Sequence, residues 1–339
     1  MSRIGTLTIK DVAQRARVST ATVSSVINSS AFVSEPLRRR VEQAIEELDY
    51  RPNGVARSLK KRRTRSVGLL ISNILNPFYT ALVRGIEDIA VEHAYNLILC
   101  NTDHDADKER MYLGVLREKR VDGIIVTSPP IEGQLSALQR EGITVVLLDC
   151  RPERIGASVH VVVVDNAAGA FQGTEHLVRH GHRPIAFLGF PLQLFTGRER
   201  LKGYKQALEA YGMTADNELI VTRGLSVECA FEEMLRLLDR PSPPRAVFAA
   251  NNSMTRGAVM AVRERGLRIP QDVALVGFDD FEWAPFVDPP ITVVSQPTYE
   301  LGSTAATMLI QRLESEEPLE PQVKVLPVKL VVRQSCGCP

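Results

Sequence analysis

Apolar side chains recur at helical spacing over the first fifty residues and divide them into three short amphipathic segments. Thr8 followed by Asp11 is the pattern of a capping box that starts the first helix, and Ser19 and Ser34 are suitable N-caps for the next two. The positions expected on the buried faces are Ile9, Val12, Ala13, Ala16, Val23, Val26, Ile27, Leu37, Val41, Ala44, Ile45 and Leu48. The pattern predicts a small all-α unit.

From Ser66 onward, short apolar strands alternate with amphipathic helices. The expected strands are SVGLLIS, YNLILC, DGIIVTS, TVVLLD, VVVVD, IAFLG, ELIV, AVFAA and VALVGFD, with helices such as TALVRGIEDIAVEHA, GRERLKGYKQALEA and TRGAVMAVRERG between them. This alternation predicts α/β architecture, with doubly wound parallel sheets covered on both faces. The roughly 270 residues are too many for one such sheet, so we expect two similar lobes.

The composition is that of a globular protein: 339 residues, 44% apolar and 24% charged. We find no apolar run of about 18 residues and no export signal, so we expect no membrane association. The five cysteines are odd in number and scattered, which favours a reducing cytoplasm.

The net charge of +1 conceals an asymmetry between the two ends of the chain. Residues 1–65 contain 14 Lys/Arg and 6 Asp/Glu, a net charge of +8, whereas the remainder contains 27 and 34, a net charge of −7. A basic head on a mildly acidic body suggests contact with a polyanion, although a solubilising tail would give the same composition.

The second predicted helix is rich in small hydroxyl side chains. A helix-turn-helix places its second helix in the major groove of DNA, with the helix N-terminus near base edges and phosphates. Ser and Thr hydroxyls can donate or accept at either, and Ala or the Thr methyl can touch a thymine methyl. The head is therefore expected to bind DNA.

Two segments, TIKDVAQRARVSTATVSSVIN and LDYRPNGVARSLK, resemble the DNA-binding head of the lactose/galactose repressor family, closest in wording to its purine-repressor branch. The resemblance implies three parts: a head over 1–52, a hinge and linker over 53–65, and a two-lobed, periplasmic-binding-protein-like core over 66–339. It also implies that the first lobe takes about 66–164 and 294–321, and the second about 165–293 and 322–339.

The resemblance also implies which residues of the head and hinge contact DNA. Base-reading places are taken by Thr20, Ala21 and Ser25, and backbone-contacting places by Thr22, Ser24, Asn28 and Tyr50; Thr8, Ser19, Asn53, Ala56, Arg57 and Lys60 belong to the same DNA-binding set. Leu59 takes the place of a leucine wedge that kinks the duplex at its centre. Eight residues are too short to hold a helix alone, so we expect the hinge to fold only on DNA.

Polar and aromatic residues follow several predicted strands, at the sheet edge where ligands of parallel sheets bind. They are Asn73, Phe78, Tyr79, Asp149, Arg200, Asn251, Asp279 and Trp283, to which the resemblance adds Thr196 and an apolar wall at Leu225. Carboxylates, amides, a guanidinium and rings suit a polyhydroxylated ligand. Leu194 stands where the purine-binding branch has an arginine, and Cys150 where it has an aromatic residue, which favours a sugar or sugar derivative over a purine.

Signals for catalysis or a metal are weak in this sequence. There is no phosphate-binding loop and no strand-linked G-x-G-x-x-G. His176, His180 and His182 have partly ligand-like spacing but lie where a helix ends, and the terminal Cys336-Gly-Cys338 lacks a second ligand pair. We expect no catalytic site, no metal site and no cofactor.

The sequence therefore predicts a ligand-responsive transcriptional regulator, most simply a repressor. It would bind a pseudo-palindromic operator in double-stranded DNA as a homodimer, because duplicated heads require duplicated half-sites. Two alternatives stay open: a soluble sugar-binding or sensor protein without operator-specific function, and a purine-responsive repressor.

Overall fold

The computed structural model describes residues 7–28, 30–50, 63–128, 133–152, 159–317 and 319–338. The chain divides into two compact units, Met1–Arg65 and Ser66–Pro339, and each is described by itself. The hinge positions Asn53, Ala56, Arg57, Leu59 and Lys60 lie outside the described residues.

The first unit contains the three expected helices, α1 (Ile9–Ala16), α2 (Thr20–Asn28) and α3 (Glu35–Glu47). Asp11 closes the N-terminus of α1 by accepting a 2.7 Å hydrogen bond from the Thr8 amide. Val12, Val23 and Val41, one from each helix, are fully buried and form the centre of a small core. Seven of the twelve positions predicted to be buried are buried, and Ile9, Ile27, Ile45 and Leu48 pack partly buried against this core, whereas Leu37 is half-buried outside it.

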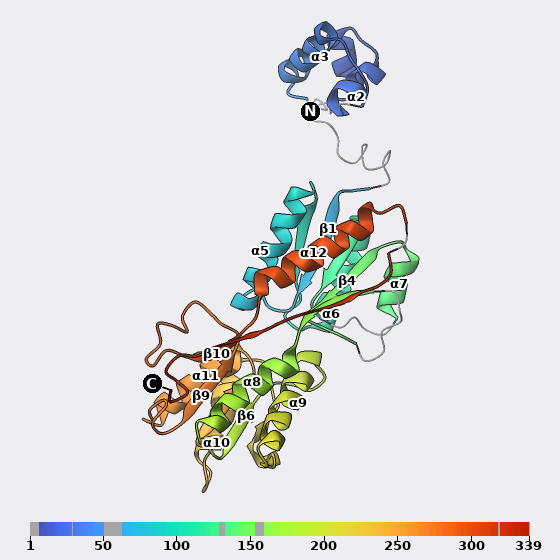
Figure 1. The fold of residues 1–339 in the computed structure, drawn as a ribbon. Helices are drawn as coiled ribbons and strands as arrows, with labels where there is room; N and C mark the ends of the chain where they lie inside the picture. Colours follow the sequence, from blue (N-terminus) through green and yellow to red (C-terminus); the bar gives the residue numbers. More distant parts are fainter. Residues whose placement is uncertain are drawn as a thin grey trace. The chain divides into compact units, whose positions relative to one another are not determined.

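The second unit contains two six-stranded sheets, each with helices on both faces (Figure 1). The first sheet has the order β11-β5-β4-β3-β1-β2 and is parallel throughout; the second has the order β12-β10-β9-β8-β6-β7 and is parallel except where β10 meets β12. This is the doubly wound architecture that the sequence predicts.

The first lobe is built from β1 (Ser66–Ile71), α5 (Pro77–Glu92), β2 (Asn96–Asn101), α6 (Ala106–Glu118), β3 (Gly123–Val126), α7 (Gln134–Arg140), β4 (Thr144–Leu148), β5 (His160–Val164), α12 (Thr298–Glu314) and β11 (Val323–Leu326). Alternate strand residues point to opposite faces. Leu69 and Ile71 of β1 pack under α5 and α12, whereas Leu70, between them, packs under α6.

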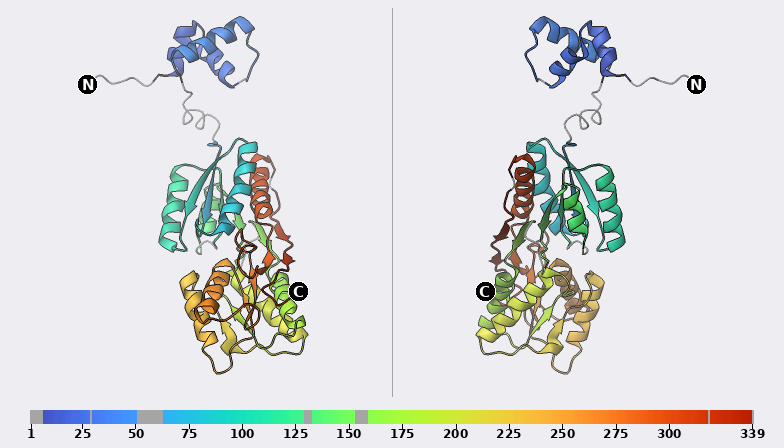
Figure 2. Two further views of the ribbon diagram at one scale, coloured as in Figure 1. Left: turned by 90° about the vertical axis from the view of Figure 1, so that its left-hand side faces the viewer. Right: turned by 90° about the vertical axis from the view of Figure 1, so that its right-hand side faces the viewer.

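Helices α5 and α12 lie side by side on one face of the first sheet (Figures 1 and 2). Two glycines allow this close packing. A Cβ at Gly302 would come within 2.1 Å of the Leu82 carbonyl oxygen, and one at Gly85 within 2.2 Å of that of Tyr299. Backbone therefore meets backbone at this crossing, and neither site has room for a methyl group.

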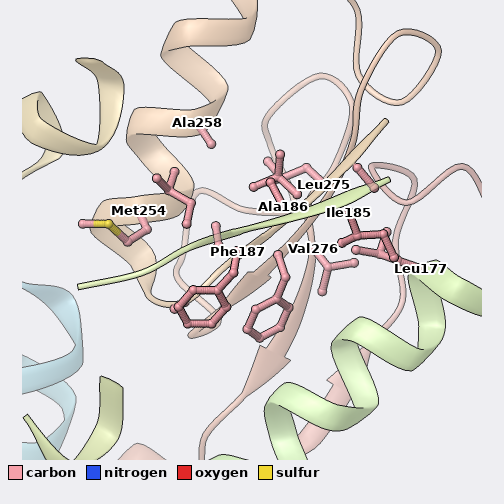
Figure 3. Packing of buried hydrophobic residues seen from close by; sticks show 14 of the residues in the cluster. Leu177, Ile185, Ala186, Phe187, Met254, Ala258, Leu275 and Val276 are labelled. Atoms are coloured by element: carbon pink, nitrogen blue, oxygen red, sulfur yellow. The ribbon is translucent and has the colours of Figure 1, made fainter. Parts of the chain in front are cut away.

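The second lobe is built from α8 (Asn166–Arg179), β6 (Ile185–Leu188), α9 (Phe195–Ala210), a 3₁₀ turn (Asn217–Leu219), β7 (Ile220–Val221), α10 (Val227–Leu238), β8 (Ala246–Ala249), α11 (Asn252–Glu264), β9 (Ala274–Phe278), β10 (Thr292–Ser295) and β12 (Lys329–Val331). Figure 3 shows Met254 and Ala258 of α11 on one side of the strands and Leu177 of α8 on the other.

The chain crosses between the lobes three times: after β5, between β10 and α12, and between β11 and β12. The predicted lobe boundaries are wrong in two places. Residues 294–295, expected in the first lobe, end β10 of the second sheet. Residues 323–326, expected in the second lobe, form β11, because their backbone pairs in parallel with β5 along the edge of the first sheet.

Candidate functional site

Helix α2 presents the residues expected to read DNA. Thr20, Ala21 and Asn28 are exposed, and Ser25 is half-buried at the edge of the same surface. Ser19 fixes the start of the helix, since its Oγ accepts a 3.0 Å hydrogen bond from the Thr22 amide. A rigid helix face with short side chains can approach base edges closely.

The other head residues predicted to contact DNA differ in how exposed they are. Thr8 is exposed, and Thr22 and Ser24 are half-buried. The Asn28 side chain donates a 2.8 Å hydrogen bond to the Ser24 carbonyl, closing the last turn of α2. Tyr50 is only 8% exposed and packs in the core of the head. Its ring therefore stabilises the fold, in addition to the DNA-backbone contact expected of it.

In the second unit, a cavity of about 80 Å³ lies between the two lobes at the carboxyl ends of their strands. Nine of the ten predicted effector-binding residues line it: Asn73, Phe78, Tyr79, Asp149, Thr196, Arg200, Leu225, Asn251 and Asp279. Leu194, which the resemblance sets at the place of the purine-contacting arginine, also lines it, as does His104 in the loop after β2. The lining is completed by residues that were not placed there from sequence: Asn76, Phe190, Ser253 and Gln296. The fold therefore gathers the strand-end residues in one place.

Trp283 is the predicted residue that does not line this cavity. Its ring stacks on Phe281 at 3.8 Å between centroids and lines a neighbouring, wider groove of about 770 Å³. The chain turns after β9 through Asp279, and the Phe281 stack holds the indole outside the inner space. The groove shares Asn73, Asn76, Leu225 and Ser253 with the cavity.

Arg200, on α9, is the buried cation of the site and is 3% exposed. Its Nε donates to Asn166 Oδ1 at 2.8 Å and its Nη1 to the Ala250 carbonyl at 2.7 Å. The guanidinium also lies 3.7 Å from the centroid of the Phe278 ring. Burial lowers the pKa of Arg200, whereas the nearby Asp279 and Asp149 raise it. These contacts fix the direction in which the guanidinium faces.

Asp149 carries the least satisfied carboxylate of the cavity. Its backbone has a φ of 57°, which turns the chain sharply at the end of β4. Its Oδ1 is buried and has no hydrogen-bond partner among the described residues. Burial raises the pKa of Asp149 to about 7; Arg200 opposes the rise and Asp279 adds to it. The carboxyl therefore has an acceptor free for a ligand.

Asp279 follows β9 with a φ of 78° and is 7% exposed. It accepts hydrogen bonds from the Asn252 amide at 3.2 Å and from Gln296 Nε2 at 2.5 Å. The oxygen of the same side-chain amide, Gln296 Oε1, is buried and has no hydrogen-bond partner among the described residues. Gln296 is missed from sequence because it follows β10, a strand that the apolar pattern does not reveal.

A direct hydrogen bond links the lobes beside the cavity. Asn252 Nδ2, on α11, donates to Asn76 Oδ1, at the start of α5, at 2.6 Å. Asn76 Oδ1 also accepts from the Phe78 amide at 2.9 Å and so caps α5. The cavity is thus enclosed by two lobes that are held together at one side by amide side chains.

Among the described residues, none of the helices is long and apolar enough to cross a membrane. The architecture is that of a regulator with a helix-turn-helix head and a two-lobed ligand-binding core, and comparison with known proteins supports it. Residues 8–53 match the family model of bacterial regulatory proteins of the lacI family, and residues 174–336 match that of a periplasmic binding protein-like domain.

The chain belongs to the lacI family of bacterial transcriptional regulators. It is 40% identical to the HTH-type transcriptional regulator RegA of Clostridium saccharobutylicum, over 96% of this chain and 98% of that protein. Its structure resembles that of a complex of the transcriptional regulator CelR with cellobiose, with a TM-score of 0.74 and 35% identity over 97% of this chain and 99% of the other. It also resembles a lac repressor dimer bound to operator and an anti-inducer, with a TM-score of 0.84 and 28% identity over the same shares.

Proposed function

We propose that this protein is a cytoplasmic, non-enzymatic repressor that binds a pseudo-palindromic operator as a homodimer and responds to a sugar or sugar derivative in the cavity between its lobes. The observation that carries the effector class is a pair of buried acceptors, Asp149 Oδ1 and Gln296 Oε1, neither of which has a partner in the part of the chain that the structure describes. Buried acceptors without partners cost free energy, which the hydroxyl donors of a sugar would recover. The related structure with cellobiose supports the same class.

The rest of the lining favours a sugar over a purine. Arg200 offers donors opposite the acceptors, and Phe190, Leu194 and Leu225 supply apolar walls for the less polar faces of a sugar ring. Leu194 occupies the position of the purine-contacting arginine and cannot donate a hydrogen bond to a base. We propose neither a cofactor nor catalytic residues for this cavity.

DNA binding would be coupled to the cavity through the lobes. The lobes would close around a ligand, and the hinge segment 53–65 leads directly into the first lobe in each subunit of a dimer. A ligand can shift operator affinity only by binding one lobe arrangement better than another. The hinge, with Leu59 as wedge, would then order on DNA only when the two copies lie close together.

Operator binding tests the DNA-binding part. The operator is selected from genomic fragments with the full-length protein, and its affinity is measured by fluorescence anisotropy at several salt concentrations. A regulator should lose affinity steeply, with a log–log slope of roughly −0.9 per neutralised phosphate, and should prefer the operator to random DNA. A sugar carrier with a basic tail would show no such preference. Leu59→Ala should weaken specific binding far more than non-specific binding.

A thermal-shift screen of sugars, polyols, sugar acids and purines tests the effector class, because a ligand of the native state raises the melting temperature. A hit should also change operator affinity, and Asp279→Ala should remove that change while operator binding without ligand persists. A response to purines alone would contradict the proposal.

A further inference from the structure

Four metal-ligating side chains meet at the far end of the second lobe, and we name them the His–Cys cluster: His176, His180, Cys336 and Cys338. Cys338 Sγ lies 3.1 Å from His176 Nε2, 3.1 Å from His180 Nε2 and 3.0 Å from Cys336 Sγ. The ligand atoms of His176, Cys336 and Cys338 all lie within 4.8 Å of one another. A Cys₂His₂ donor set is the composition of structural zinc sites.

The fold builds this cluster from two segments that are distant in the chain. His176 and His180 are four residues apart at the end of α8, so they share one face of the helix. Gly337 has a φ of 83°, a backbone conformation that suits glycine and lets both flanking cysteines turn toward α8. The two pairs are held together by the tail that follows β12.

Neighbouring groups contact the candidate ligands and orient them, as the groups that hydrogen-bond to metal ligands do in known metal sites. His180 Nδ1 lies 2.8 Å from the His176 carbonyl, a contact that makes Nδ1 the protonated nitrogen and leaves Nε2 free as a ligand. His182 Nε2 holds the Cys336 carbonyl at 2.8 Å. Cys336 is fully buried, and the Thr292 hydroxyl contacts its sulfur at 3.2 Å.

We propose that the His–Cys cluster is a structural Zn²⁺ site that fastens the C-terminal tail to α8. All four ligands would come from the protein, as in closed structural sites rather than catalytic ones. Zinc–nitrogen and zinc–sulfur bonds of about 2.1 and 2.3 Å require ligand separations of about 3.5 Å. The contacts of Cys338 at 3.0 and 3.1 Å would lengthen by about half an ångström, and His180, which lies outside the group of three ligands within 4.8 Å of one another, would move closer to the other ligands.

Two features favour a metal over a disulfide. The sulfurs are 3.0 Å apart, well beyond a bond of about 2.05 Å, and a disulfide would leave both histidines without a role.

The site is separate from the effector cavity. Asn166, which holds Arg200, begins α8, and His176 lies ten residues further along the same helix, about 15 Å away at 1.5 Å per residue. The proposal therefore stands or falls independently of the sugar and the operator.

Cobalt titration of the full-length protein tests the site. The protein is treated with a chelator and a phosphine reductant and titrated anaerobically with Co²⁺, which reports tetrahedral thiolate ligation through visible d–d bands and a near-ultraviolet sulfur-to-cobalt band. We expect one Co²⁺ per chain, displaced by one Zn²⁺, and a raised melting temperature with Zn²⁺.

Variants locate the binding. Cys338→Ser, at a partly exposed position, should halve the sulfur-to-cobalt band, and Cys336→Ser with Cys338→Ser should abolish it. His180→Ala, at an exposed position, should weaken Co²⁺ binding in competition with a chromophoric chelator. Cys229→Ser removes a thiol outside the cluster and should leave the spectrum unchanged. The proposal is overturned if reduced protein gives no thiolate band, or if the double serine variant, still folded by circular dichroism, binds Co²⁺ as wild type does.

Discussion

Asn252 and Asn76 join the two lobes of the core through a 2.6 Å side-chain hydrogen bond beside the cavity. Each also has a local role, since Asn76 caps α5 and the Asn252 backbone amide donates to Asp279. The bond can form only when the lobes are as close as they are here. It therefore stabilises the lobe arrangement described here relative to a more open one.

Removing this bond should weaken the binding of any effector that selects the closed lobes. Asn252→Ala keeps the backbone contact to Asp279 and should lower effector affinity about fivefold, the equivalent of a net hydrogen bond of about 1 kcal/mol. Calorimetric titration with the effector found in the screen measures it. Asn217→Ala, an exposed asparagine in the 3₁₀ turn, is the control. A double-mutant cycle with Asn76→Ser should show non-additive losses; additive losses would mean that the two residues act separately.

The pKa of Asp149, raised to about 7, predicts a pH-dependent cost to stability. The unfolded chain loses this proton near pH 4 and the folded chain only near pH 7, so the stabilisation that Asp149 contributes is complete below about pH 4 and lost as the pH rises through 7. Asp149→Asn removes the titration. Its melting temperature should exceed that of the wild type by a margin that grows from pH 4 to pH 8; a constant margin would argue against the raised pKa.

The glycine contact between α5 and α12 predicts that two Gly→Ala substitutions will differ in their effect on stability. Gly302→Ala places a methyl group 2.1 Å from the Leu82 carbonyl oxygen and should destabilise the core by about 1–3 kcal/mol. Gly114→Ala, inside α6 with no atom within 4 Å of the added carbon, should be neutral or stabilise by up to about 1 kcal/mol. Urea unfolding of both variants measures these changes. Equal effects would show that the helices can separate at little cost.

The N-cap of α2 should control the stability of the head. Ser19→Ala removes the acceptor of the Thr22 amide and should cost about 1 kcal/mol, a large share of the stability of so small a unit. Amide hydrogen exchange on the full-length protein should be faster in α1 to α3 and unchanged in the two-lobed core. Ser30→Ala, an exposed serine just beyond α2, should leave exchange as in the wild type.

The apolar pattern predicts the three head helices and nine strands, including β2 and β7, which bury little of their surface. It misses β11 and β12, whose residues are exposed or half-buried, and also β10, a buried strand of four residues. Strand ends also locate most of the cavity, because parallel strands bring their carboxyl ends to one edge. Asn76 and Gln296 are not predicted as cavity residues, because Asn76 precedes a helix and Gln296 follows β10, which the apolar pattern misses.

The His–Cys cluster shows a different limit of sequence reasoning. Two histidines on α8 and a Cys-Gly-Cys tail are each too weak a signal to predict a metal site. Cys338 and His176 are 162 positions apart, and only the packing of the tail against α8 brings them together. No pattern within either segment indicates that the two residues lie close together.

The three crossings between the lobes have a consequence for how the protein is made. Helix α12, which covers one face of the first sheet, and β11, which closes its edge, follow most of the second lobe in the chain and leave the ribosome after it. The nascent first lobe therefore exposes an apolar surface while nearly the whole second lobe is synthesised. A premature stop at residue 320 would take an edge strand from both sheets.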